Sequence, residues 1–200
     1  MNELKNLIEN GSITDPSSAR GRLLVKAAHL FKVHGYERTT VRELAAEVGI
    51  QSGSIFHHFK TKEEILRAVM EETILYNTAL MRRALADCVT GKEQVLALIR
   101  CELESITGKT GEAMTVLVYE WRSLSEESQS RILKLRGIYE QLWMDALNQA
   151  KAEGSIVGDT FTLRRFLTGA LSWTATWFRP EGGMSLDDLA GQALLLAIKD

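Results

Sequence analysis

Proline and cysteine are both scarce in this sequence of 200 residues, with two of each. Scarce proline leaves long stretches free to form helix, because proline removes a backbone donor and breaks a helix interior. No segment alternates apolar and polar residues between turn dipeptides, the pattern that predicts strands. Cys88 and Cys101 are too few for a disulfide framework and have no partners at metal-binding spacing. These absences predict an all-α protein with two ordinary buried thiols.

Long apolar runs are also missing. No stretch approaches the roughly 18 residues that span a bilayer, and the N-terminal letters MNELKNLIEN lack the basic and apolar regions of a signal peptide. We therefore expect a cytoplasmic protein with no membrane partner. Apolar residues make up 45% of the chain, which is enough to supply a core.

Glycine and polar breaks divide the chain into helices. The predicted helices beyond residue 60 are 62–88, 92–107, 110–123, 126–153, 160–178 and 185–198. Residues 1–17 carry turn formers and no pattern that predicts packing, so we expect a mobile arm there. The remainder is expected to form an N-terminal domain at 18–77, which begins with a helix at 18–34, and a larger helical domain at 78–200.

The segment from Thr39 to Ile65 contains two short helical patterns joined by a glycine turn. Apolar residues of the first pattern have the spacing of one buried helical face, and they are Val41, Leu44, Ala45 and Val48. Thr40 and Glu43 form a capping box at its start, and Gly49 suits the left-handed turn at its end. This arrangement predicts a helix-turn-helix, which lays its second helix in the major groove of DNA.

The residues at the start of the second helix are small and polar, as close approach to base edges requires. They are Ser52, Gly53 and Ser54. Arg42, on the preceding helix, is the strongest candidate for a specific contact, because arginine can bind O6 and N7 of guanine with two hydrogen bonds. His57 and His58 are adjacent and therefore point about 100° apart on a helix, which argues against a metal site.

Charge is divided unevenly along the chain. The net charge is −2. Residues 17–62 hold eight Lys and Arg against three acidic residues, a balance of +5, which leaves −7 for the remainder. All four histidines also lie in that basic segment. This division is expected if one end of the protein meets a polyanion and the other does not.

Residues 18 to about 77 resemble the DNA-binding domain of the TetR family of bacterial transcriptional regulators. The matching motifs are an aromatic-Gly-aromatic end of the first helix, a TT-V start of the second and an HF-K-K-E start of the fourth, within ARGRLLVKAAHLFKVHGYERTTVRELAAEVGIQSGSIFHHFKTKEEIL. The resemblance implies a three-helix DNA-binding domain joined by a long helix to a ligand-binding and dimerisation domain. It implies a double-stranded DNA operator as partner and no cofactor.

The resemblance also implies roles for single residues. Ser52 occupies a position that often reads bases, and three further positions hold phosphates in the family: Thr40, His58 and Lys62. Phe56 stands where tyrosine is usual, so only ring contact with the DNA backbone remains. Gln51 replaces the usual Ser or Thr and is a weaker cap. Outside the family pattern, Arg20 and Arg22 oppose the helix dipole at the start of the first helix, which suggests either phosphate contact or a solvated face.

A homodimer is expected, because useful affinity generally needs two reading heads on one face of the duplex. The last two predicted helices, 160–178 and 185–198, are the candidates for its interface. The second of them is apolar over more of its circumference than one core contact requires. A deeply buried helix in a monomer is the alternative.

Aromatic and methionine residues gather in the later helices and could line a ligand pocket or an ordinary core. The candidate ligand-binding residues are Met81, Met114, Glu120, Trp121, Arg136, Tyr139, Trp143, Trp173 and Trp177. An ion pair between Glu120 and Arg136 would be purely structural, whereas Arg136 with Tyr139 at a pocket mouth would bind an anionic ligand.

A finer resemblance points to one ligand class. The letters EWRSLSEESQSRILKLRGIYEQLW and WTATWFRPEGGMSLDDLA are similar to TetR-family regulators of fatty-acid and steroid breakdown, whose ligands are acyl-coenzyme A thioesters. Arg136 or Arg179 would then meet the coenzyme phosphates. Multidrug-type aromatic cations are the rival, favoured by Glu120.

The expected function is a repressor that leaves a palindromic operator when a ligand moves the helix beginning at Lys62. A ligand-dependent activator is an alternative. An enzyme is not expected, because the sequence has no GxSxG elbow, P-loop or metal spacing. The basic N-terminal segment argues against a module that contacts only proteins. A steep salt dependence of DNA binding would exclude such a module.

Overall fold

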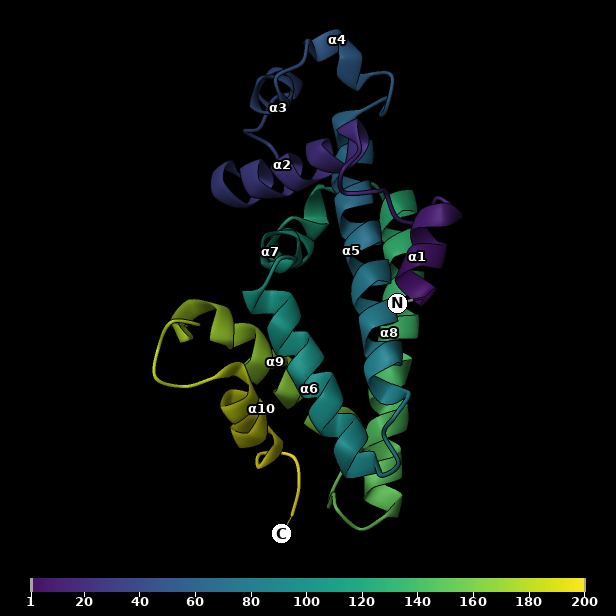
Figure 1. Ribbon diagram of the computed structural model, residues 1–200, viewed down its shortest axis with the longest axis vertical. Coiled ribbons are helices and arrows are strands. Elements are labelled where there is room, and N and C mark those ends of the chain that lie inside the picture. The colour runs from purple at the N-terminus through teal and green to yellow at the C-terminus, as the bar shows by residue number, and fades with distance from the viewer. Residues whose placement is uncertain (1, 200) are drawn as a thin grey trace. The chain divides into compact units, whose positions relative to one another are not determined.

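The computed structural model describes residues 2–199, and these form helices without any strand (Figure 1). The α-helices are α1 (Asn2–Glu9), α2 (Ala19–His34), α3 (Val41–Val48), α4 (Ser52–Ile55), α5 (Lys62–Leu85), α6 (Gly91–Thr107), α7 (Gly111–Tyr119), α8 (Glu126–Ala152), α9 (Thr160–Trp177) and α10 (Leu186–Leu194), with a 3-10 helix η1 at Trp121–Ser123. Within residues 2–199, no helix combines the length and the apolar character needed to cross a bilayer. The all-α prediction is confirmed.

The predicted helix limits agree with the observed ones to within four residues, and the predicted helix 110–123 is divided into α7 and η1. The second helix of the helix-turn-helix ends at Ile55, after which residues 56–58 continue as turns. Their amides bond three residues back, as in the 2.8 Å bond from the His58 amide to the Ile55 carbonyl. The last helix ends at Leu194 and not at residue 198. Turns follow at residues 195–197, and the amides of Leu196 and Ala197 again bond three residues back.

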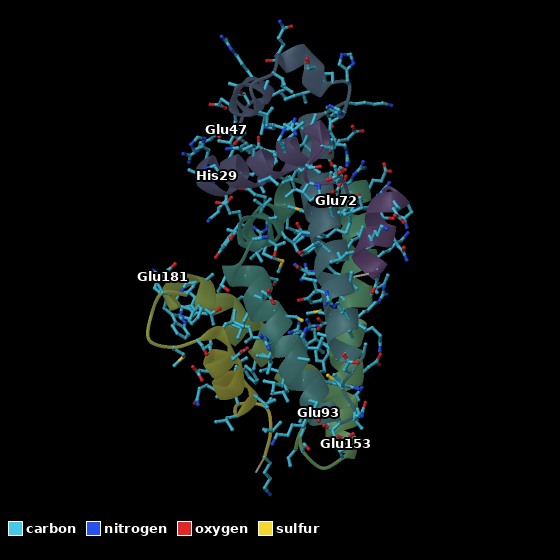
Figure 2. All side chains as sticks on the ribbon, viewed as in Figure 1. His29, Glu47, Glu72, Glu93, Glu153 and Glu181 are labelled. Carbon is cyan, nitrogen blue, oxygen red and sulfur yellow. The ribbon has the colours of Figure 1, made fainter. Side chains whose placement is uncertain are left out.

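Residues 2–17 make contacts that the sequence pattern did not predict. Residues 2–9 form α1, and Ile13 is buried. Thr14 donates from both its amide and its hydroxyl to the carboxylate of Glu72 on α5 (labelled in Figure 2), each at 2.8 Å. Residues 2–17 thus contain a helix and a buried apolar side chain that no local sequence pattern predicted, because the partner of Thr14 lies 58 residues away in the chain.

The chain divides into two compact units. One contains Met1–Tyr76 with Glu112–Arg136, and the other contains Asn77–Gly111 with Gly137–Asp200. The first break falls after Tyr76, one residue before the expected division. However, residues 112–136 were expected in the C-terminal domain, and they belong to the unit that contains the helix-turn-helix.

Hydrogen bonds and ion pairs hold residues 112–136 inside the first unit. The Glu63 carboxylate, near the start of α5, accepts from the Ser125 amide at 2.9 Å and from the hydroxyls of Ser125 and Ser128 at 2.6 and 2.8 Å. These bonds keep the pKa of Glu63 below its ordinary value. Arg131 pairs with Glu71 at 3.0 Å. The starts of α5 and α8 are thus fastened to each other.

The second unit has its own apolar core. Helix α6 packs against α9 and α10, and Trp143 of α8 and Met81 of α5 are fully buried in the same core. At one end, the Gly91 amide at the start of α6 donates to the Glu153 carboxylate at 2.8 Å. Figure 2 shows Glu93 and Glu153 at that same end of the unit.

A charged cluster lies inside this core. Arg164 on α9 pairs with Glu102 on α6 at 3.2 Å and with Glu140 on α8 at 3.2 Å. The Tyr139 hydroxyl donates to Glu102 at 3.1 Å, and the Arg164 guanidinium lies 4.2 Å from the centre of the Trp143 ring. Burial raises the pKa of the Glu102 carboxyl, against the opposing charge of Arg164. The cluster joins three helices.

Replacing Arg164 by Met is expected to destabilise the protein by about 3–5 kcal/mol, because it leaves Glu102 buried without its cation. Glu102 then has a still higher pKa, so the folded state binds a proton more tightly than the unfolded state and stability falls as pH rises above about 4.5. Urea denaturation should show a larger loss at pH 8 than at pH 5. The double variant Glu102→Leu/Arg164→Met is the control and should recover most of the stability; equal losses at both pH values would contradict this account.

Candidate DNA-reading site

The site begins where α3 starts. Thr40 caps α3 with its hydroxyl, which accepts from the Glu43 amide at 3.1 Å, while the Glu43 carboxylate accepts from the Thr40 amide at 2.7 Å. The predicted capping box is confirmed. The hydrogen bonds from Thr40 keep the pKa of Glu43 below its ordinary value. This cap fixes the first turn of α3, on which Arg42 lies.

A left-handed glycine joins α3 to α4. Gly49 has φ 72° and ψ 32°, a conformation that costs glycine little. Gln51 gives α4 no side-chain cap, as its sequence predicts. Ile55 and Phe59 are buried and hold α4 and the following turn against the rest of the unit. Figure 1 shows α3 and α4 together at the end of this unit, beyond α2.

The predicted base-reading residues of α3 and α4 differ in how far they are exposed. Arg42 and Gly53 are exposed, whereas Ser52 and Ser54 are partly buried. A Cβ added at Gly53 would meet nothing within 4 Å, so the fold does not require glycine there. A missing side chain at an exposed position on the reading helix instead permits close approach of DNA to the backbone. Phe56 is exposed, which agrees with ring contact.

Of the three residues predicted to contact phosphates, one is exposed and two make hydrogen bonds within the protein. His58 is exposed. The Thr40 hydroxyl is engaged in its cap. The Lys62 ammonium donates to the carbonyls of Tyr36 and Thr39 at 2.8 and 3.0 Å. The Lys62 ammonium therefore faces carbonyls of its own chain, and the phosphate contact expected from its family position stays a prediction.

The two arginines at the start of α2 are engaged as well. Arg20 pairs with Glu72 at 2.8 Å and lies 4.7 Å from the centre of the Phe59 ring. Arg22 donates to the Ser17 carbonyl at 2.6 Å. Arg20 therefore stabilises the unit, and the structural interpretation of its position is favoured.

Other cations of the basic segment remain free. Arg38, Arg42 and Lys60 are exposed and have no ion-pair partner among residues 2–199. By contrast, Lys26 pairs with Glu47 at 2.8 Å. Unpaired exposed cations keep their full charge for a partner, and phosphate is the partner that such a patch attracts.

The candidate ligand residues are not gathered in one unit. Met114, Glu120, Trp121 and Arg136 belong to the first unit. Met81, Tyr139 and Trp143 belong to the core of the second, whereas Trp173 and Trp177 of that unit are exposed on α9. Glu120 accepts from the Ser123 hydroxyl at 3.2 Å, and the Glu120–Arg136 ion pair, one of the two alternatives for these residues, is absent from the described residues.

Sequence reasoning missed the charged cluster of Glu102, Glu140 and Arg164. These residues lie on three helices and share no local spacing, so no sequence pattern could pair them. The one available signal was an arginine within the largely apolar pattern of 160–178, since buried charges need partners.

A capped helix, a left-handed glycine turn and a second helix with small residues at its start define this protein as a helix-turn-helix DNA-binding protein. Two family models match the chain. Residues 23–69 match the model described as bacterial regulatory proteins, tetR family. Residues 88–200, more than half of the chain, match the model described as tetracyclin repressor-like, C-terminal domain.

Individual relatives agree with these models. The transcriptional repressor KstR2 of Rhodococcus jostii is 31% identical over 190 residues, 91% of this chain and 90% of the relative. A solved structure described as superantigen pfit is 61% identical, with a TM-score of 0.88 over 99% of this chain and 98% of the other. The ketosteroid transcriptional regulator KstR2 of Mycobacterium tuberculosis is 27% identical, with a TM-score of 0.83 over 94% and 99%. The chain belongs to the TetR family of bacterial transcriptional regulators.

Replacing Arg42 by Ala should reduce operator affinity by about 1–3 kcal/mol and relax the sequence preference at one base pair, because a bidentate contact to guanine would be lost. Binding to a panel of singly substituted operators measures both effects. Arg38→Ala is the matched control, since it removes an equally free cation outside α3 and α4. Uniform weakening by Arg42→Ala across all sequences would show that Arg42 contacts the backbone and not a base.

Proposed function

We propose that this TetR-family regulator is a homodimeric repressor that binds a palindromic operator through α3 and α4 and is released by an acyl-coenzyme A thioester. The observation that carries the DNA-reading part is the exposure of Arg42 on the capped helix α3 together with that of Gly53 on α4. The free cations Arg38 and Lys60 of the same unit supply charge for the phosphate backbone.

An exposed apolar stripe on α9 supports the homodimer. Its members recur at helical spacing, and they are Phe166, Gly169, Ala170, Trp173 and Trp177. Phe166 is 72% exposed and Trp173 is 65% exposed. Large exposed aromatic groups on one helix face mark an interaction surface. A second copy of the chain is the partner that a palindromic operator requires, since each copy reads one half-site.

Replacing Trp173 by Glu should convert the dimer to a monomer and weaken operator binding by at least about tenfold, because a charge would be buried at the interface and only one head would bind. Sedimentation measures the first effect and fluorescence anisotropy with labelled operator measures the second. Val157→Glu is the matched control, because Val157 is 76% exposed but lies outside α9 and α10. A dimeric Trp173→Glu variant would place the interface elsewhere.

Two observations favour an apolar ligand with a polar head group. The relatives at 27% and 31% identity are KstR2 proteins, and one of them is described as a ketosteroid regulator. In addition, the core of the second unit contains aromatic and methionine side chains beside the charged cluster of Arg164 and Glu102. Acyl-coenzyme A thioesters combine an apolar chain with such a polar group. Aromatic cations remain the rival class.

The ligand class can be tested together with the operator. Random duplexes are selected by the purified protein at physiological salt, and the enriched duplex is then titrated with acyl-coenzyme A thioesters of increasing chain length. Release at micromolar thioester but not by free coenzyme A is the expected result, since the acyl chain provides the apolar surface. Release by tetraphenylphosphonium alone would favour the cation class. Failure to enrich any duplex would contradict operator binding itself.

One similar solved structure is described as superantigen pfit. The exposed aromatic residues of α9 are assigned to the dimer, and the helix-turn-helix with its capped first helix is the feature that DNA reading requires. The DNA-binding regulator is therefore the function that the geometry of this chain supports.

A further inference from the structure

The Lys62 ammonium closes the turn between α2 and α3. Lys62 is the first residue of α5, yet its Nζ donates to the Tyr36 carbonyl at 2.8 Å, to the Thr39 carbonyl at 3.0 Å and to the Glu37 carbonyl at 3.4 Å. The same nitrogen lies 4.2 Å from the centre of the Tyr36 ring. An ammonium has three N–H donors, and three backbone oxygens surround it.

The position of this cation is costly in isolation. A positive charge in the first turn of a helix opposes the helix dipole, and the neighbours Glu63 and Glu64 carry the charge that suits that place. The carbonyls that Lys62 meets lie in the turn after α2, which ends at His34. Tyr36 and Thr39 are buried, so their carbonyls are little exposed to water, and the Tyr36 carbonyl also accepts from the Thr39 amide at 3.2 Å. The ammonium is a further donor to these oxygens.

The contact joins two points that bracket the reading helices. Lys62 and Tyr36 are 26 residues apart in the chain, and α3 and α4 lie between them. The Tyr36 end is itself fixed, since the buried Tyr36 ring packs edge-on against Phe31 at 5.4 Å. Thr39 is also buried and donates its hydroxyl to the Gly35 carbonyl at 2.9 Å. Thr39 directly precedes Thr40, the residue that caps α3.

We propose that Lys62 is a positioning residue for DNA reading, which sets the direction in which α3 and α4 leave α2, and that it does not bind phosphate. The inference rests on the operator binding proposed above. A phosphate contact from the same ammonium would have to replace at least one of its three carbonyl contacts.

Three substitutions separate this role from the alternatives. Lys62→Met removes the charge and keeps the length of the side chain. Lys62→Arg keeps the charge, but a planar guanidinium cannot direct three donors at the oxygens that surround a single nitrogen. Lys60→Met is the matched control, because it removes one exposed and unpaired charge of the same unit. Each variant is assayed as the full chain, below its unfolding temperature, on the selected operator and on a scrambled duplex of equal length.

The expected result for Lys62→Met is a loss of operator affinity of about tenfold or more, with affinity for the scrambled duplex changed by less than about threefold. The slope of log K against log salt should stay unchanged, because no phosphate contact is lost. Lys62→Arg should also lose preference for the operator, in part, although its charge is intact. Lys60→Met should leave the ratio of the two affinities unchanged.

Other outcomes would overturn the proposal. A salt slope reduced by about 0.9, with equal weakening on both duplexes and full activity of Lys62→Arg, would make Lys62 a phosphate contact. An unchanged affinity ratio in both Lys62 variants, with only a lower unfolding temperature, would give it a purely structural role. If the wild-type chain shows no preference for any duplex, the proposed function fails first, and that failure is visible before any variant is made.

Discussion

A recognition helix of four residues cannot hold its own direction. Helix α4 has little more than one turn, and isolated helices of that length are unstable because nucleation costs more than so few hydrogen bonds return. Its orientation must come from its neighbours. The buried side chains of Ile55 and Phe59 anchor it, Gly49 sets its angle to α3, and Arg20 covers the Phe59 ring. The small size of the reading element explains why so much of the first unit serves to support it.

The need to hold α4 in place also accounts for the different roles of the positive side chains in this unit. Arg20 and Lys62, at the starts of α2 and α5, have internal partners and stabilise the scaffold. Cations at the exposed edge, such as Arg38 and Arg42, have none among the described residues. A net balance of +5 therefore overstates the charge that faces DNA, because part of it is neutralised within the protein.

Much of this arrangement was predictable from sequence, because its signals are local. The capping box of Thr40 and Glu43, the turn at Gly49 and the weak cap at Gln51 follow from spacings of a few residues, and each was observed. What could not be predicted depends on contacts between distant segments. The bonds of Glu63 to Ser125, and of Arg164 to Glu102, each join residues about sixty positions apart. Likewise, the family position of Lys62 indicated a phosphate, but only coordinates reveal the carbonyls that surround it.

The placement of residues 112–136 in the first unit has a consequence for protein engineering. The two family models leave a gap at residues 70–87, which is the natural joint for exchanging sensor domains between relatives. A hybrid joined in this gap after Glu71 would take Glu63 and Glu71 from one parent but Ser125 and Arg131 from the other. Such a hybrid would split a set of bonds that the native chain makes within one unit. A working hybrid of this regulator should therefore carry residues 112–136 from the same parent as its DNA-reading helices.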